Sequence, residues 1–508
     1  MDAAIATNAA LAVVAGHSCG LGGDAFWLVW DVDRSEVVAL NGSGRSGGAT
    51  TIEAAHAAGH TVMPQRGPWS VTVPGAIDSW GKAHERFGRL DWATLLAPAI
   101  DLAGGFLASP GWLGAVERGT AVFGDDGDWA RIYRPSDRAQ APGAIVRLPA
   151  LARTLRTLAA EGPTSAYSGT IAGHTAAYFS SRGVPIDSDD LTAHTSDWVS
   201  PIGTTYRGVA SVSHPPNSAG VVALQTLAML ERFDAPAASG FGGHGWEDAD
   251  WVHLGLEVSR VALVERDAHV TDAAYMPTDA IAEMLSAELL EALAARIDPD
   301  RTMPPRPGSL AAGGGTIYIT VADRWGGLVS VLESNYQGFG SGLVDPQTGI
   351  AFQDRGAFFR LDPAHPNALA PRKRTAHTLA PGMLLRDGRP WMAHGSMGGE
   401  IQPQIFAQFV SAVVDGGADV ATAVAAPRWA ALMRVQHGPP DLTQLESRVP
   451  EDLVTELGSR GHDVAVCEPW SSTMGHAHAI EVLRDSSGTV ESYAAAADPR
   501  CEGLAAAW

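Results

Sequence analysis

The chain has 508 residues, of which 45% are hydrophobic and 18% are charged, a balance typical of folded globular proteins rather than disordered chains. This length is too great for one simple core, so two domains or one large layered domain are expected. The formal net charge of -21 argues against nucleic acid or an anionic membrane as a partner, because attraction to phosphate needs a basic surface.

The three cysteines, Cys19, Cys467 and Cys501, form neither a disulfide framework nor a zinc-binding pattern. No apolar run reaches membrane-spanning length. The apolar start lacks a basic segment, so it predicts a buried helix rather than a signal peptide. These features together predict a cytoplasmic protein.

Helices and strands are predicted in blocks along the first 300 residues. Residues 25–32 and 35–40 alternate as two strands around a turn at Asp33–Arg34. Asp91 is the expected N-cap of the next helix, and residues 117–145, which are polar and rich in Pro and Gly, predict a surface loop. Helices are expected at residues 90–103, 151–162 (closed by Gly162), 219–233 and 251–267.

A linker of Pro, Ala and Gly is predicted at about residues 299–315, and the pattern changes after it. Residues 316–321 alternate with period two, as in a strand, and a second strand follows at 326–334. Residues 402–417 have the spacing of a helix. Because strands and helices come in blocks and not as a repeated βαβ unit, a layered α+β architecture is favoured over a doubly wound sheet.

Three glycines, Gly313 to Gly315, run directly into Thr316 at the start of this strand. If the Gly315–Thr316 bond is cut, the Thr316 hydroxyl becomes a nucleophile, and its own α-amino group, with a reference pKa of about 7.7–8.0, becomes a nearby base. The chain could make the cut itself, if the hydroxyl attacks the preceding carbonyl and the resulting ester is hydrolysed. The alternative is an ordinary glycine-rich loop before an edge strand, and these residues alone favour that alternative.

Six segments of the chain, taken in order, resemble those of the γ-glutamyltransferase family, a branch of the N-terminal-nucleophile hydrolases. The resemblance implies a four-layer αββα sandwich that is autoprocessed into an α chain, residues 1–315, and a β chain, residues 316–508. Dimers of such heterodimers are a further possibility. The matching segments are residues 2–31, 71–103, 214–231, 315–350, 370–390 and 395–404.

The same resemblance implies the catalytic residues. Thr316 stands where the family has its processed nucleophile, which makes Gly315–Thr316 the cleavage site. Ser334 stands where a threonine hydroxyl supports the new amine, and it keeps a hydroxyl. Gly398 and Gly399 match the pair whose N–H groups form the oxyanion hole, and a pair of glycines before a helix suits that task.

The substrate-binding positions carry over with several departures. Arg45 lies where an arginine binds the substrate carboxylate, and a guanidinium fork suits that task. The acidic residue that holds an α-amino group is replaced by Phe358, with Arg355 three residues before it. A small anionic acyl group is therefore expected, as in the amidohydrolase and acylase branch. The full set of expected substrate-binding residues is Arg45, Asn335, Tyr336, Arg355, His377 and Thr378.

Other motifs have plainer explanations. The G-F-G-G-H-G run at 240–245 matches a nucleotide-binding pattern, but no strand precedes it, so a turn is favoured. His476 and His478 share one strand face without a third ligand at a typical spacing. A buried structural thiol is favoured for Cys19 over a nucleophile. No metal and no organic cofactor are expected.

The expected reaction is hydrolysis or transfer of an amide-linked acyl group through an acyl-enzyme on Thr316. Three alternatives remain open on sequence grounds. The chain could be a true γ-glutamyltransferase or glutathione hydrolase, which Phe358 argues against. It could be a biosynthetic relative that cleaves a C–C bond, or an unprocessed homologue without enzymatic activity.

Overall fold

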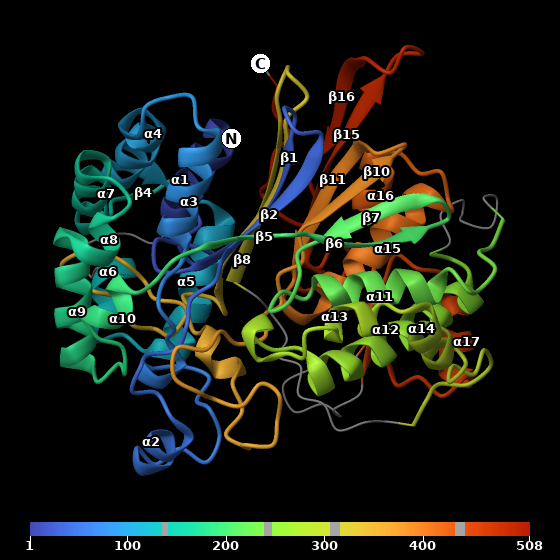
Figure 1. Cartoon of the computed structure of the whole chain (residues 1–508), viewed down its shortest axis with the longest axis horizontal. Coiled ribbons are helices and arrows are strands. Elements are labelled where there is room, and N and C mark those ends of the chain that lie inside the picture. The colour runs from blue at the N-terminus through green and yellow to red at the C-terminus, as the bar shows by residue number, and fades with distance from the viewer. Residues whose placement is uncertain (135–140, 238–245, 305–314, 432–441, 508) are drawn as a thin grey trace.

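A computed structural model describes residues 1–134, 141–237, 246–304, 315–431 and 442–507. Two β-sheets stack face to face at its centre, and helices cover both outer faces (Figure 1). This arrangement confirms the four-layer αββα sandwich, and both halves of the sequence contribute strands to each of the two central sheets.

The first central sheet is antiparallel, with strand order β5-β2-β1-β9-β8. Every residue of β1 and β9 is buried, because helices cover one face and the second sheet covers the other. β8 lies at the edge. The strands are β1 (Asp24–Asp31), β2 (Glu36–Gly42), β5 (Asp197–Val199), β8 (Gly315–Ala322) and β9 (Leu328–Tyr336).

The second central sheet has strand order β16-β15-β11-β10-β7-β6. Its inner face meets the first sheet through a small apolar cluster that includes Leu28 and Trp30 of β1 with Met383 and Val482. Its strands are β6 (Ile202–Tyr206), β7 (Val209–Ser213), β10 (Gly382–Arg386), β11 (Arg389–Met397), β15 (His476–Arg484) and β16 (Val490–Ala496).

Two smaller sheets lie outside the sandwich core. β3 (Phe106–Leu107) pairs with β4 (Ile145–Val146). The other small sheet has the order β12-β13-β14, and it consists of β12 (Trp429–Ala430), β13 (Thr443–Glu446) and β14 (Val464–Cys467).

The helical layers bury one large apolar cluster on each side of the sandwich. The helices that precede β5 are α1 (Asp2–Val14), α2 (Ile52–Ala57), α3 (Ala76–Phe87), α4 (Trp92–Gly104), α5 (Pro110–Phe123), α6 (Asp128–Tyr133), α7 (Pro149–Glu161), α8 (Ser165–Ser168), α9 (Thr170–Arg182) and α10 (Ser188–Thr192). The later helices are α11 (Gly220–Leu230), α12 (Ala249–His269), α13 (Ala280–Met284), α14 (Ala287–Ala294), α15 (Gln402–Val414), α16 (Val420–Ala425) and α17 (Glu451–Ser459). Single turns of 3-10 helix span Pro68–Ser70, Ala273–Tyr275, Arg355–Phe358, Gly399–Ile401 and Ser472–Met474.

Most predicted elements are confirmed, including the N-cap at Asp91, whose side chain accepts a hydrogen bond from the Thr94 N–H at 3.0 Å. The predicted loop at 117–145 is wrong in part, because it contains the end of α5, all of α6 and the start of β4. Trp129 and Tyr133 of α6 are buried against Phe339, so tertiary packing outweighs the loop-like composition.

Residues 305–314 of the predicted linker and the G-F-G-G-H-G run at 240–245 lie outside the described residues. Within the described part of the chain, no helix combines the length and apolar character needed to cross a membrane.

Candidate active site

Thr316 is the second residue of the edge strand β8, where the chain enters the sandwich. A shift in register at this point pairs Gly315 with Tyr336 and Thr316 with Ser334. A Cβ atom at Gly315 would lie 2.8 Å from the carbonyl oxygen of Gln337, so this position has no room for a side chain. The nucleophile predicted from sequence thus lies directly after this irregularity of the strand and is 3% exposed.

The Ser334 hydroxyl connects both sides of the Gly315–Thr316 bond. Ser334 Oγ lies 2.9 Å from Thr316 Oγ1 and donates to the Gly315 carbonyl oxygen at 2.8 Å. Because a serine hydroxyl has one hydrogen, this arrangement makes the Thr316 hydroxyl the donor to Ser334. The Tyr336 N–H also donates to Ser334 Oγ, at 2.8 Å.

Arg355 is a buried cation next to this serine. Its Nη2 donates to Ser334 Oγ at 3.1 Å, and its Nη1 donates to Thr378 Oγ1 at 3.2 Å. The guanidinium carbon lies 4.4 Å from the centre of the Tyr336 ring. Burial lowers the pKa of Arg355, and nearby acidic groups, Asp24 first among them, oppose that shift. The structure therefore brings together four residues that the sequence predicted separately, namely Ser334, Tyr336, Arg355 and Thr378.

Asp24 and His377 lie beside Arg355 and are fully buried. His377 Nε2 lies 3.3 Å from Asp24 Oδ2, and Asp24 Oδ1 accepts the Gly44 N–H at 2.9 Å. Burial raises the pKa of Asp24 to about 7, against the opposing effect of Arg355. Burial, with a further contribution from Arg355, holds the pKa of His377 well below its usual value. Sequence reasoning missed Asp24, which opens β1 directly opposite Ser334.

Gly398 and Gly399 form a tight turn between β11 and α15. Their φ angles of 155° and 58° lie in the region that favours glycine. A Cβ atom at Gly398 would lie 2.9 Å from Ile401 Cγ1, so a larger residue would also collide with the helical turn that follows. The turn leads into the N-terminus of a helix, where backbone N–H groups are free to stabilise negative charge.

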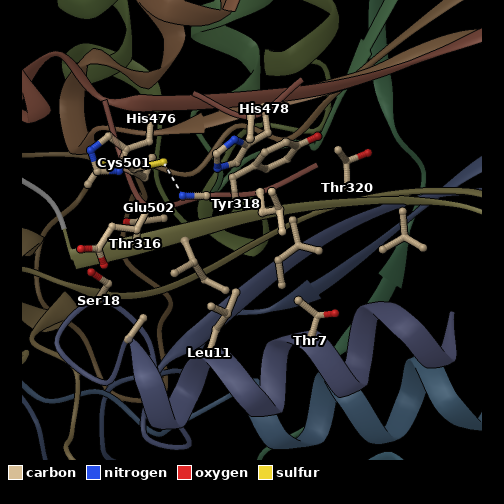
Figure 2. A pocket seen from close by; sticks show the side chains of 18 of the residues that line it. Thr7, Leu11, Ser18, Thr316, Tyr318, Thr320, His476, His478, Cys501 and Glu502 are labelled. Atoms are coloured by element: carbon tan, nitrogen blue, oxygen red, sulfur yellow. Dashed lines mark hydrogen bonds between the residues drawn. The ribbon is translucent and has the colours of Figure 1, made fainter. Parts of the chain in front are cut away.

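A cavity of about 2390 Å³ opens beside Thr316 and runs along β8. Gly398 lines it together with Thr316, and Figure 2 shows His476, Cys501 and Glu502 at the same end of the cavity as Thr316. The Glu502 carboxylate accepts the Gly111 N–H of α5 at 2.9 Å, so the C-terminal segment crosses this region. Thr316 consequently lies between a buried polar cluster and an open cavity.

Arg45 lies apart from Arg355 and its neighbours Asp24 and His377. Its Nη2 pairs with Asp197 Oδ2 at 3.2 Å, and Arg374 binds the same carboxylate oxygen at 2.6 Å. Burial alone would raise the pKa of Asp197. Arg374 and Arg45 together outweigh this effect, so the pKa of Asp197 lies below its usual value. Within the described residues, no hydrogen bond joins Arg45 to Thr316, Ser334 or Arg355.

The remaining predicted positions have structural contacts. Asn335 is buried, and its N–H donates to the Ser18 carbonyl oxygen at 3.0 Å. Phe358 packs edge-on against Tyr336, with ring centres 5.4 Å apart. Phe358 also carries the Arg266 guanidinium 5.7 Å from its ring centre. An aromatic side chain with aromatic and cationic neighbours thus stands at the position that departs from the family pattern.

The three cysteines are free, and all of them lie in the described ranges. A group that sequence reasoning missed, His253, Glu257 and His462, has the proximity that a metal site requires. These groups are already engaged, since His253 Nδ1 lies 2.7 Å from His462 Nε2 and Glu257 accepts the Met303 N–H at 2.8 Å. Their proximity could not be read from the sequence, because His253 and Glu257 lie on α12 whereas His462 follows α17.

Known proteins resemble this chain over nearly its whole length. The sequence model of the gamma-glutamyltranspeptidase family matches residues 1–508. An oxamate amidohydrolase proenzyme from Klebsiella pneumoniae is 36% identical, with 100% of this chain and 94% of that protein covered. A glutathione hydrolase-like YwrD proenzyme from Bacillus subtilis is 34% identical, with 99% and 93% covered.

A solved structure of cephalosporin acylase from Bacillus halodurans has 35% sequence identity and a TM-score of 0.89, with 100% of this chain and 91% of that chain covered. The chain therefore belongs to the gamma-glutamyltranspeptidase family, as a γ-glutamyltransferase-like amidohydrolase of the N-terminal-nucleophile type.

Proposed function

We propose that this protein cuts its own Gly315–Thr316 bond and then hydrolyses amides of a small anionic acyl group through Thr316. The products of the cut are the α chain 1–315 and the β chain 316–508. Two relatives carry the word proenzyme in their names, which supports a processed product. The observation that carries the proposal is the Ser334 hydroxyl, which bonds both the Thr316 hydroxyl and the Gly315 carbonyl.

Cleavage begins with attack of Thr316 Oγ1 on the carbonyl carbon of Gly315. Ser334 donates to the oxygen of that carbonyl, which makes its carbon a better electrophile and stabilises the developing negative charge. The C–N bond breaks, the hydroxyl proton ends on the released amine, and an ester joins the two parts. Water then hydrolyses this ester, which leaves a carboxylate on Gly315 and a free amine on Thr316.

The mature reaction uses the same hydroxyl. The new amine, with a reference pKa of about 7.7–8.0, takes the Thr316 proton as Oγ1 attacks the substrate carbonyl. The N–H groups of Gly398 and Gly399 stabilise the oxyanion, and loss of one such donor typically costs about 100- to 1000-fold in rate. The amine of the substrate leaves with a proton, and water releases the acid from Thr316.

The buried Arg355 supports an anionic acyl group. Its side chain donates hydrogen bonds to two neutral hydroxyls, those of Ser334 and Thr378. A guanidinium with neutral partners beside the nucleophile suits a carboxylate on the acyl group, because a charge-assisted bond is stronger than a neutral one. Arg45 would bind the outer end of the substrate, in exchange for part of its pairing with Asp197.

Hydrolysis assays on matched substrates test this choice. Oxamate presents a carboxylate next to its amide, whereas γ-glutamyl-p-nitroanilide presents an ammonium group as well. We expect a higher kcat/KM for oxamate, because Phe358 offers no charge to an ammonium group. A higher kcat/KM for the γ-glutamyl substrate, with transfer to added dipeptides, would establish a true γ-glutamyltransferase instead.

A further inference from the structure

His476 lies on the cavity side of the nucleophile, and the strand registers fix the direction of its side chain. In the antiparallel pair β11–β15, Gly395 is opposite His478, and Met397 is opposite His476. Residues two apart on a strand share a face. His476 and His478 therefore point to the same side of the second sheet.

The first sheet faces this side through β8. The Tyr318 ring stacks on His478, with centres 6.2 Å apart and planes at 15°. A Cβ atom at Gly395 would lie 2.5 Å from Tyr318 Cε2, so β11 and β8 pack closely here. Thr316 is two residues before Tyr318 and shares its face, as His476 does with His478. Figure 2 shows Thr316 and His476 at the same end of the cavity.

Gly475, the residue before His476, lies against the turn formed by Gly398 and Gly399. A Cβ atom at Gly475 would lie 2.5 Å from the Met397 carbonyl oxygen and 3.6 Å from Gly398 Cα. Behind it, Asp498 Oδ2 accepts the Ala477 N–H at 2.6 Å and pairs with Arg428 at 2.5 Å. The start of β15 is therefore held rigidly against the turn that offers its N–H groups to the oxyanion.

The imidazole of His476 has a nitrogen without a partner. Its Nε2 is buried and makes no hydrogen bond to any described residue. By contrast, His478 Nδ1 accepts the Asp498 N–H at 3.1 Å. Burial lowers the pKa of His476 to about 4, so the ring is neutral near pH 7 and can either donate or accept. A buried nitrogen without a hydrogen-bond partner destabilises the folded state unless a ligand supplies that partner.

We propose that His476 is a positioning residue that hydrogen-bonds the amine half of the amide substrate, so that it selects the leaving group. This inference rests on the proposed function and divides the substrate site into two parts. The acyl half lies toward Ser334 and Arg355, whereas the amine half lies in the cavity toward His476. His476 carries no proton in the reaction, because the amine of Thr316 supplies the proton that the leaving group takes.

Pairs of amides that share an acyl group and differ in the amine test this division. Suitable pairs are oxamate with N-phenyloxamate, and γ-glutamylamide with γ-glutamyl-p-nitroanilide, and the pair with the higher wild-type kcat/KM is used. We expect His476→Ala to lower kcat/KM about 10- to 100-fold for the substituted amide and at most about threefold for the unsubstituted one. His476→Gln should recover part of this loss, because its amide can still donate and accept.

Matched controls separate positioning from folding. His478→Gln changes a histidine on the same strand face and should leave the preference between the two amines unchanged. All three variants should still split at Thr316, as intact mass shows, which keeps failure of this inference distinct from failure of the proposed function. Equal losses for both amines in His476→Ala, or the same shift in preference in His478→Gln, would overturn the proposal.

A second measurement does not depend on turnover. In processed protein with ¹⁵N-labelled histidine, the His476 ring signals are identified by their loss in His476→Gln. Titration with p-nitroaniline, the amine product of γ-glutamyl-p-nitroanilide and an analogue of the aniline that N-phenyloxamate releases, should shift these signals and leave those of His478 in place. Unchanged His476 signals at saturating p-nitroaniline would contradict the assignment of the amine half to this side.

Discussion

Two groups of buried charges differ in how well they are matched. The Arg500 network, which comprises Arg428, Glu446, Asp498 and Arg500, pairs each cation with carboxylates at 2.5 to 3.1 Å. Burial alone would raise the pKa of Asp498, but Arg428 and Arg500 lower it below its usual value. For Asp498, Glu446 and Arg500, therefore, the fold favours the charged form.

The Arg355 cluster, which comprises Asp24, Arg355 and His377, has the opposite balance. The hydrogen bonds of Arg355 go to hydroxyls, and the pKa of Asp24 is raised to about 7. The fold thus holds charges that it does not fully pair, next to the proposed nucleophile Thr316. Such a difference is expected where one group serves stability and the other serves a substrate.

Breaking the Arg500 network should have the largest effect on stability. Asp498→Ala leaves Arg428 and Arg500 without their shared carboxylate, and removal of one partner of a buried pair typically costs about 3–5 kcal/mol. The free energy of unfolding, measured in urea, should fall by about this amount. Asp101→Ala, at an exposed site on α4, should change it by less than about 0.5 kcal/mol. A loss below about 1 kcal/mol for Asp498→Ala would show that the network is not stabilising.

Breaking the Arg355 cluster should act on catalysis instead. Arg355→Met removes the cation but keeps an unbranched apolar stem, and kcat/KM for an anionic acyl substrate should fall about 30- to 1000-fold. An uncharged analogue, such as the methyl ester of the same acid, should lose much less. Equal losses for the two substrates would mean that Arg355 holds Ser334 in place and does not bind the acyl carboxylate.

The pH dependence of stability sharpens the comparison. The raised pKa of Asp24 means that, between about pH 4 and pH 7, the folded state binds a proton that the unfolded state has lost. The contribution of Asp24 to stability is therefore lost as pH rises through this window, by roughly 2–4 kcal/mol. Asp498 behaves in the opposite way, because its contribution is lost as pH falls below about 4.

Asp24→Asn isolates this effect, since asparagine can still accept the Gly44 N–H. Chemical unfolding between pH 5 and pH 8, in a Thr316→Ala background that keeps one chain, should show a flatter profile for Asp24→Asn than for its parent. Identical slopes in the two proteins would show that Asp24 is ionised throughout.

Arg45→Gln should have the smallest effect. Arg45 shares Asp197 with Arg374, so removal of Arg45 leaves that carboxylate paired. We expect KM to rise about three- to tenfold with kcat unchanged, as for a residue that binds ground and transition states equally. A fall in kcat larger than that of Arg355→Met would contradict these assignments. It would mean that Arg45 binds the acyl carboxylate near Thr316 and that Arg355 has the smaller role.

Sequence reasoning reached the layered fold and the residues around Thr316, because these depend on local pattern and on resemblance. Thr316, Ser334 and Gly398 lie on strands or turns whose periodicity and glycine content are visible in the sequence. It did not reach Asp24, which meets Ser334 only through pairing of β1 with β9, some 300 residues apart in the chain. Composition also misjudged α6, because burial of Trp129 and Tyr133 against Phe339 depends on the tertiary fold.

Intact mass and N-terminal sequencing of the purified protein, beside Thr316→Ala, test the central claim most directly. The account predicts two fragments in the wild type, with the smaller beginning Thr-Ile-Tyr-Ile, and one uncut, inactive chain in the variant. A fully active protein whose second chain begins at any other residue would contradict it, and so would a Thr316→Ala protein that still splits at this bond.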